Sequence, residues 1–340
     1  MADLFSTDIV NAVVASLFVA PQFLTERFFP NMQTSMTEQI HWDTLLGKRR
    51  ISPFVSPLVE GQIVASLGYT TGTFQPAYIK DKRVFDMNRP IKRWAGEQIG
   101  GNMNPQDRLR ALLAHDLQDQ LDMLNRRLEV MAAEVLITGQ STISGDKYPT
   151  VVINFGRDPS CTVTPPKLWS DTTSNPGTDL QNWQTQILQL IGAQLPDVIM
   201  DVNAWVAFKN NPQVTSTLNL YRTIGAPPTV RPDTVMEEGG TFMGTYNAFN
   251  LWVYAGWYVD PNTGVEQPIF PSGKVVLTGP QLQGVRAFGA IRDEFAGLQP
   301  LPYFVKSWVE QDPSVRFIMM QSAPLMVPYR PNAVAVAQVL

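Results

Sequence analysis

The stretch NPQDRLRALLAHDLQDQLDMLNRRLEVMAAEVLITG, residues 104–139, decides the fold class of this chain. Asn104 can cap a helix, Pro105 suits the first helical turn, and Gly139 can end the helix. Between them, apolar residues recur every three or four positions and so share one stripe: Leu109, Leu112, Leu113, Leu117, Leu121, Leu124, Leu128, Met131 and Val135. Most charged residues lie off this stripe: Arg110, Asp119, Asp122, Arg126, Arg127 and Glu129. We predict a long helix across a sheet, roughly 50 Å in length at 1.5 Å per residue.

A coiled-coil dimer is the alternative for this helix, and the rest of the chain disfavours it. Strand patterns surround the helix, and a mixed fold buries a striped helix against a sheet. The length of 340 residues favours two or three subdomains.

The composition indicates a subunit of an assembly. Charged residues make up 16% of the chain, against roughly 25% in an ordinary soluble domain. A surface covered by neighbouring subunits needs less charge than a surface in water. The net charge of -4 provides no global attraction to nucleic acid or anionic lipid. A membrane protein would also be poor in charge, but no apolar run approaches the roughly 20 residues that span a bilayer.

Residues 1–50 have the pattern of an arm. Apolar clusters are interrupted by Pro21 and Pro30, and a short amphipathic helix is expected from Thr7. The first basic residue is Arg27, so the apolar run at 9–20 lacks the basic leader of a secretory signal. Because the arm has little core of its own, we expect it to pack on a neighbour.

Residues 51–93 are predicted to form a long β-hairpin. They are rich in β-formers and are punctuated by Gly61, Gly68 and Gly72. A ribbon of two strands is marginal in water, so we expect it to lie on another surface.

The remaining chain alternates between helices and strands. A strand is predicted at 150–155, a loop at 158–177, a helix at 179–195, a buried strand at 198–200 and a short helix at 203–209. Strands then dominate, at 251–255, 257–259, 275–278, 284–291, 316–321, 325–327 and 334–339.

We predict no catalytic, cofactor-binding or metal-ligating residue. The histidines His41 and His115 and the single cysteine Cys161 are too few for a metal cluster, and no Gly-x-Ser-x-Gly elbow presents a serine. Gly47-Lys48-Arg49 lacks the upstream glycine and the following Ser or Thr of a phosphate loop. The acidic pairs Glu237-Glu238 and Asp293-Glu294 are expected to be surface charge.

The carboxyl end resembles that of the lambda-type major head proteins of tailed bacteriophages. The resemblance covers residues 306–326, and its most specific piece is the Gln-Ser-Ala-Pro-Leu-Met string at 321–326. Shorter similar stretches follow the same order along the chain, at 55–61, 74–80, the long helix, 203–208 and 284–289. The resemblance is therefore distributed over most of the sequence.

This resemblance implies an α+β architecture, the Hong Kong 97-type capsid fold. It assigns 1–50 to an amino-terminal arm, 51–93 to an extended β-hairpin loop, and 94–159 to a peripheral domain with a spine helix at about 105–138. It further assigns 160–300 to an axial domain, and 301–340 to carboxyl strands that return to the peripheral domain. No enzymatic activity and no cofactor are implied.

The same resemblance implies a major capsid protein that forms hexamers and pentamers of an icosahedral head around double-stranded DNA. Its partners would be further copies, a separate scaffold protein, a portal, a decoration protein and packaged DNA contacted without specificity, and no membrane. It would reside in the virion after assembly in the host cytoplasm. The basic run Lys48-Arg49-Arg50 is expected to be a solvated turn, or a contact with DNA or scaffold, and Lys80 and Lys82 are noted as candidates for the covalent crosslinks of some relatives. Alternatives are an encapsulin-like shell and a soluble hydrolase with an acidic pair.

Overall fold

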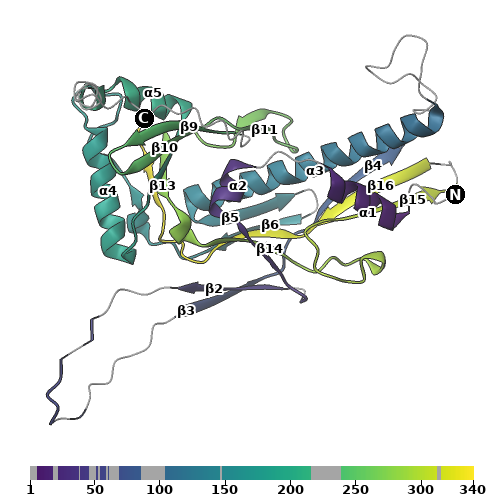
Figure 1. Ribbon diagram of the computed structural model, residues 1–340, viewed down its shortest axis with the longest axis horizontal. Helices are drawn as coiled ribbons and strands as arrows, with labels where there is room; N and C mark the ends of the chain where they lie inside the picture. The colour runs from purple at the N-terminus through teal and green to yellow at the C-terminus, as the bar shows by residue number, and fades with distance from the viewer. Residues whose placement is uncertain are drawn as a thin grey trace.

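The computed structural model describes residues 6–17, 22–37, 39–45, 51–52, 54–58, 60, 69–85, 104–145, 148–215, 239–311 and 315–340. One long helix, α3 (Pro105–Thr138), runs through the molecule and connects two packed regions (Figure 1). Its predicted bounds are confirmed. Asn104 accepts a hydrogen bond from the Asp107 amide at 2.8 Å, and Gly139 ends the helix in the left-handed conformation with φ 72°.

The amino-terminal half of α3 packs on a three-stranded sheet of order β15-β16-β4 and on helix α1 (Thr7–Ser16). The strands are β4 (Ile79–Phe85), β15 (Phe304–Glu310) and β16 (Val315–Ser322). We call their shared interior the small core. It consists of Val10, Val14, Phe85, Leu112, Leu113, Leu117, Leu121, Leu124, Val305, Ile318 and Met320.

The carboxyl-terminal half of α3 contributes Leu128, Ala132, Ala133, Val135 and Leu136 to a much larger interior, which we call the main core. The main core is centred on a six-stranded sheet of order β7-β18-β13-β8-β10-β9. Its strands are β7 (Thr162–Val163), β8 (Asp197–Asp201), β9 (Gly240–Tyr246), β10 (Phe249–Tyr254), β13 (Lys274–Thr278) and β18 (Ala335–Gln338). Every residue of β8 is buried, which agrees with the prediction of a buried strand there.

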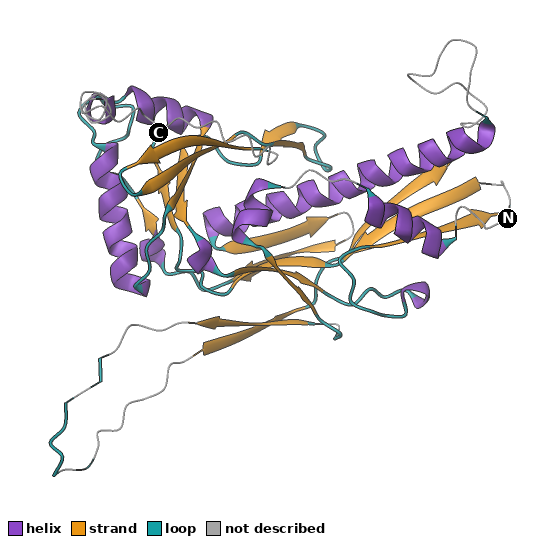
Figure 2. Ribbon diagram, in the orientation of Figure 1, coloured by secondary structure: helices purple, strands orange, loops and turns teal. Residues whose placement is uncertain are grey.

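Helix α4 (Pro176–Ile191) contacts β18 of this sheet, and helix α5 (Val202–Asn210) contacts β8 and β10 (Figure 2). Asp201 caps α5 by accepting hydrogen bonds from the amides of Asn203 and Ala204. Trp183 of α4 stacks on Trp169 with ring centroids 6.0 Å apart. Both helices were predicted from sequence. The segment before α4 contains a 3-10 turn (Pro159–Cys161) and β7, and it is otherwise the expected loop.

Smaller sheets complete the fold. One has the order β1-β14-β17, with β1 (Asn31–Thr34), β14 (Gly284–Phe288) and β17 (Pro324–Pro328). Hairpins are formed by β5 (Gln140–Gly145) with β6 (Tyr148–Asn154), and by β11 (Trp257–Val259) with β12 (Glu266–Pro268). Further 3-10 turns are at Pro280–Leu282 and Glu294–Ala296.

The boundary placed at residue 50 between arm and hairpin was wrong. Strand β2 (Ile40–Leu45) pairs antiparallel with β3 (Tyr69–Phe74), so the hairpin takes one strand from the predicted arm. The other expected ribbon strand, β4, pairs instead with β16 in the sheet under α3. Residues 54–58, expected to be extended strand, form a turn-containing loop in the described part.

The arm also differs from expectation, because it packs on its own chain. Val10 and Val14 of α1 lie in the small core, and Phe23, Leu24 and Phe28 of α2 (Phe23–Phe28) lie in the main core. The apolar clusters that seemed to need a neighbour are covered by segments distant in sequence.

The carboxyl strands do not all return to the region of the long helix. Strand β16 pairs with β4, and β17 contacts α3, but β18 pairs with β13 and β7 in the six-stranded sheet. The assignment of all of 301–340 to one region therefore fails for β18. Its alternation-free Ala-Val-Ala pattern suits a strand buried on both faces.

Candidate assembly interface

The residues considered for metal ligation lie on three different elements. His41 lies on β2 and His115 on α3, and both side chains are exposed. Cys161 is buried in the 3-10 turn, where burial raises the pKa of its thiol to about 11. Within the described ranges, no three His, Cys, Asp or Glu side chains gather as a metal site.

The acidic pair Asp293-Glu294 was expected to be surface charge, and this is wrong for Asp293, which is buried, whereas Glu294 is exposed. Asp293 accepts hydrogen bonds from Lys306, from Gln321 at 2.9 Å and from the Phe295 amide at 3.1 Å. Although its partial burial opposes ionisation, these donors hold the pKa of the Asp293 carboxyl below its ordinary value. Its oxygens thus hold a loop on the sheet. Glu237-Glu238 and the basic segment 47–50 lie outside the described residues.

An exposed apolar loop is the first surface feature that suggests an interface. Ile51, Phe54 and Leu58 are 92%, 105% and 93% exposed, which is close to full exposure for large apolar side chains. Figure 1 shows that the described segment 54–58 lies far from the body of the chain, beyond β2 and β3. A cluster of this kind on a protein surface marks a contact site for another protein.

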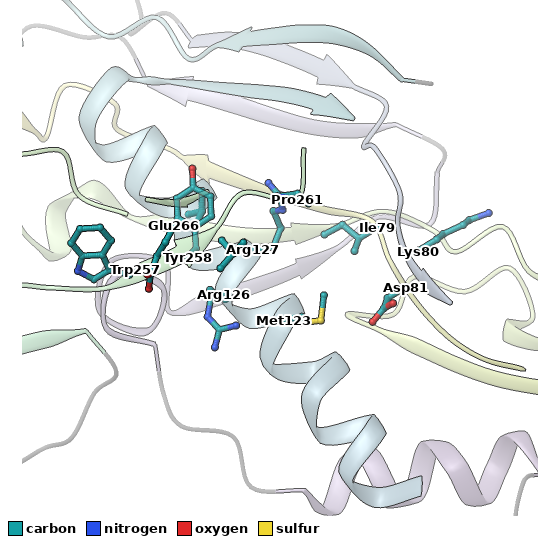
Figure 3. Close-up of a pocket in the computed structure, with 12 residues that line it drawn as sticks. Ile79, Lys80, Asp81, Met123, Arg126, Arg127, Trp257, Tyr258, Pro261 and Glu266 are labelled. Carbon is teal, nitrogen blue, oxygen red and sulfur yellow. The ribbon is translucent and has the colours of Figure 1, made fainter. Parts of the chain in front are cut away.

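A groove of about 650 Å³ is the second feature (Figure 3). Its floor comes from the middle of α3, with Met123, Arg126, Arg127 and Val130. One wall comes from Ile79, Lys80 and Asp81 of β4, and the other from Trp257, Tyr258, Val259, Pro261 and Glu266 in and around the β11–β12 hairpin. Trp257, Val259 and Met123 are 54%, 60% and 48% exposed. Apolar walls with charges of both signs suit a polypeptide segment rather than a phosphate group.

The two noted lysines lie on β4. Lys82 is positioned over the Phe317 ring, 3.7 Å from its centroid, and Lys80 lies 5.4 Å from the Tyr78 ring. Lys82 thus makes a cation–π contact with a residue of β16, and Lys80 makes one with the residue just before β4. A crosslink from either lysine remains a prediction.

Sequence reasoning missed the buried carboxylate Glu129 by placing it off the apolar stripe. Its side chain is 0% exposed and accepts hydrogen bonds from Leu24, Thr25 and Tyr254. Its partners are 104 or more positions away in sequence, so the local pattern contained no signal for them. Glu129 and its donors hold elements of this chain together, because every donor is a neutral group of the same chain.

The described part of the chain has no helix long and apolar enough to cross a bilayer. The long helix, the hairpin and the sheets together form a fold of the Hong Kong 97 capsid type. The similar solved structures agree: a proposed prophage capsid protein of Escherichia coli CFT073 has a TM-score of 0.75 at 22% identity, over 98% of this chain and 99% of that one. The capsid of Ralstonia phage GP4 has a TM-score of 0.53 at 12% identity, over 95% and 92%.

Sequence comparison then gives the family. The model described as phage major capsid protein E matches residues 6–339, and the chain belongs to this family. It is 26% identical to the major capsid protein of Escherichia phage lambda over 319 residues, 90% of each chain. It is 27% identical to the major capsid protein of Enterobacteria phage P21 over 326 residues, 92% of this chain and 93% of that one.

Proposed function

We propose that this chain self-assembles into the hexamers and pentamers of an icosahedral phage head that encloses double-stranded DNA. The observation that carries the proposal is the exposed apolar loop at 51–58, in a chain of the major capsid family. Burial of these exposed apolar side chains by neighbouring subunits is favourable, because it removes apolar surface from water. Many weak contacts of this kind, repeated around a closed shell, produce high avidity without one strong interface.

The domain assignment follows from the same proposal. We assign the axial domain to the six-stranded sheet with α4 and α5, and the peripheral domain to α3 with the sheets beneath it. The extended β-hairpin loop is reassigned to residues 40–74, which comprise β2, β3 and the segment that connects them. The arm is reduced to α1 and its flanking residues, because α2 belongs to the main core.

Partners and location complete the proposal. The subunit would assemble in the host cytoplasm with a separate scaffold protein and a portal, would accept a decoration protein, and would then reside in the virion. DNA would be contacted weakly and without sequence specificity, because a net charge of -4 provides no overall attraction to the phosphates. The chain would catalyse no reaction and need no cofactor.

The test is to express the full chain with its scaffold protein and to examine the product by sedimentation and negative-stain microscopy. Closed particles of uniform size are expected. The double variant Phe54→Ser, Leu58→Ser should remain folded but yield capsomers or monomers, because it removes the exposed apolar contacts. The matched control Met36→Ser removes an apolar side chain that is 85% exposed outside the loop and should assemble normally.

Two results would contradict the proposal. A small uniform oligomer that never assembles with scaffold would favour a soluble enzyme. Particles that contain a cargo enzyme instead of DNA in infected cells would favour an encapsulin-like compartment.

A further inference from the structure

Helix α2 lies between the long helix and the six-stranded sheet. Its Phe23 ring contacts Trp252 and Tyr254 of β10, with centroids 4.9 and 6.0 Å away. A Cβ atom on Gly240 of β9 would collide with the Phe23 ring, so the backbone of β9 approaches α2 as closely as glycine allows. Contacts on this scale leave α2 little freedom to shift on the sheet.

A carboxylate from α3 holds the beginning of α2. Glu129 accepts hydrogen bonds from the amides of Leu24 and Thr25 at 2.7 and 2.9 Å and from the Thr25 hydroxyl at 2.7 Å. The Tyr254 hydroxyl donates a fourth, at 3.0 Å, so Glu129 also connects α3 to β10. Burial raises the pKa of this carboxyl above its ordinary value in spite of the four donors. Separating Glu129 from these donors would leave a buried acid without hydrogen-bond partners, which is costly in free energy.

A second carboxylate, from the sheet, holds the end of α2. Asp197 of β8 is 2% exposed at its side chain and pairs with Arg27 through two contacts, of 2.8 and 3.3 Å. The side-chain amide of Asn250 and the indole N–H of Trp252 also donate to Asp197. Arg27 in turn lies 4.4 Å from the centroid of the Trp252 ring. The two anchors of α2 therefore come from two different elements.

The anchor on α3 is placed where the two cores meet. Leu124 is the last residue of α3 in the small core, and Leu128 is the first in the main core. Glu129 follows Leu128 directly, at the start of the helix segment embedded in the main core. Contacts that fix Glu129 relative to the six-stranded sheet therefore also fix the direction of α3. They thereby fix the position of the small core, which packs on the amino-terminal half of this helix.

We infer that α2 is a brace, and that Glu129 and Asp197 hold it at both ends so that it sets the angle between α3 and the six-stranded sheet. The effect on shell curvature rests on the proposed function. In a closed shell, the angle between the two packed regions of each subunit contributes to curvature. Glu129 and Asp197 are then positioning residues for particle size.

The first experiment measures hydrogen exchange at single-residue resolution in the full chain. Glu129→Gln replaces one carboxylate oxygen by an amide nitrogen, so either the Leu24 amide or the Thr25 amide loses its acceptor. Exchange of that amide should rise by about tenfold, and exchange should rise equally at the Phe29 amide, at the other end of the brace. Asp197→Asn should likewise accelerate both ends. Acceleration confined to the end nearest each substitution would overturn the brace, because two independent local contacts would explain it.

Glu134→Gln is the matched control. Glu134 lies on the same helix, burial raises the pKa of its carboxyl as well, and it accepts a hydrogen bond from the Thr142 amide at 2.8 Å. It connects α3 to β5 and has no bond to α2. Its substitution should leave α2 exchange unchanged. Thr25→Val, which removes only one hydroxyl donor to Glu129, is the milder variant if Glu129→Gln does not fold.

The second experiment measures particle diameters by electron microscopy after assembly with scaffold. Glu129→Gln should broaden the distribution of diameters, whereas Glu134→Gln should match the unaltered chain. Normal diameters for Glu129→Gln would overturn the link to curvature. Failure of the unaltered chain to form particles would instead overturn the proposed function, so the two failures are distinguishable.

Discussion

The two halves of α3 are buried in different ways. The amino-terminal half covers the small core with one stripe, and His115, Asp119 and Met123 remain exposed. In the carboxyl-terminal half, Ala132, Ala133 and Leu136 are buried as well as the stripe, and so is Glu129. One half is therefore an amphipathic surface helix and the other a core helix. The difference shows that an apolar stripe predicts which face is buried first, but not whether the opposite face is also covered.

Truncation of the arm should produce the largest effect and should separate the two halves. Deleting residues 1–30 removes α2 and exposes the main core where Phe23, Leu24 and Phe28 pack. We expect loss of cooperative folding, measured by thermal unfolding of the full remaining chain. Deleting residues 1–17 removes α1, with the small-core contacts of Val10 and Val14 and the hydrogen bonds between Asn11 and Val305, and should leave a folded main core. Equal behaviour of the two truncations would contradict the comparison.

Arg157→Met should produce the next largest effect. Arg157 donates hydrogen bonds to the carbonyls of Val135, Leu136 and Ile137 at 2.6, 2.8 and 3.1 Å, which satisfies the end of α3 inside the main core. Burial lowers the pKa of its guanidinium to about 10, so it remains charged at neutral pH. We expect a loss of about 3 kcal/mol in the free energy of unfolding. Arg110→Met, at the exposed start of the same helix, should change stability by less than about 0.5 kcal/mol.

The sequence predicted the long helix, both smaller helices and most strands of the six-stranded sheet, because caps and apolar periods are local signals. It failed where partners are distant. The strand Ile40–Leu45 was taken for arm because its pairing with Tyr69–Phe74 is non-local. Strand β1 was missed for the same reason, because it pairs with the distant β14. Strands β9 and β15 were missed although each pairs with the next strand of the chain in a hairpin. Glu129 was placed off the apolar stripe, and its burial was not predicted because its donors lie on the distant α2 and β10.

Alanine-to-leucine substitutions sharpen the comparison at smaller cost. Ala133 is 1% exposed in the main-core half, so Ala133→Leu should overpack it and cost about 2 kcal/mol. Ala114, partly exposed in the other half, should accept leucine with a change below about 0.5 kcal/mol. Chemical denaturation of both variants measures the difference. Similar losses at both sites would indicate that the two halves are equally enclosed.

The thiol of Cys161 should react much more slowly in the native chain than in the unfolded chain. Because its pKa is raised to about 11, only about one thiol in a thousand is ionised at pH 8, and the group is also buried. We expect iodoacetamide to modify the native chain very slowly and the guanidinium-unfolded chain rapidly, as followed by mass spectrometry. Rapid modification of the native chain would mean that the main core opens near residue 161.

The central claim is that the subunit builds its own core, including α2, and leaves the loop at 51–58 for its neighbours. A cryo-electron microscopy map of assembled particles at side-chain resolution tests it most directly. The account predicts that Leu24 and Thr25 bond to Glu129 of the same chain while Phe54 and Leu58 are buried against an adjacent subunit. A map in which α2 is exchanged between chains, or in which the loop remains uncovered in the closed shell, would contradict it.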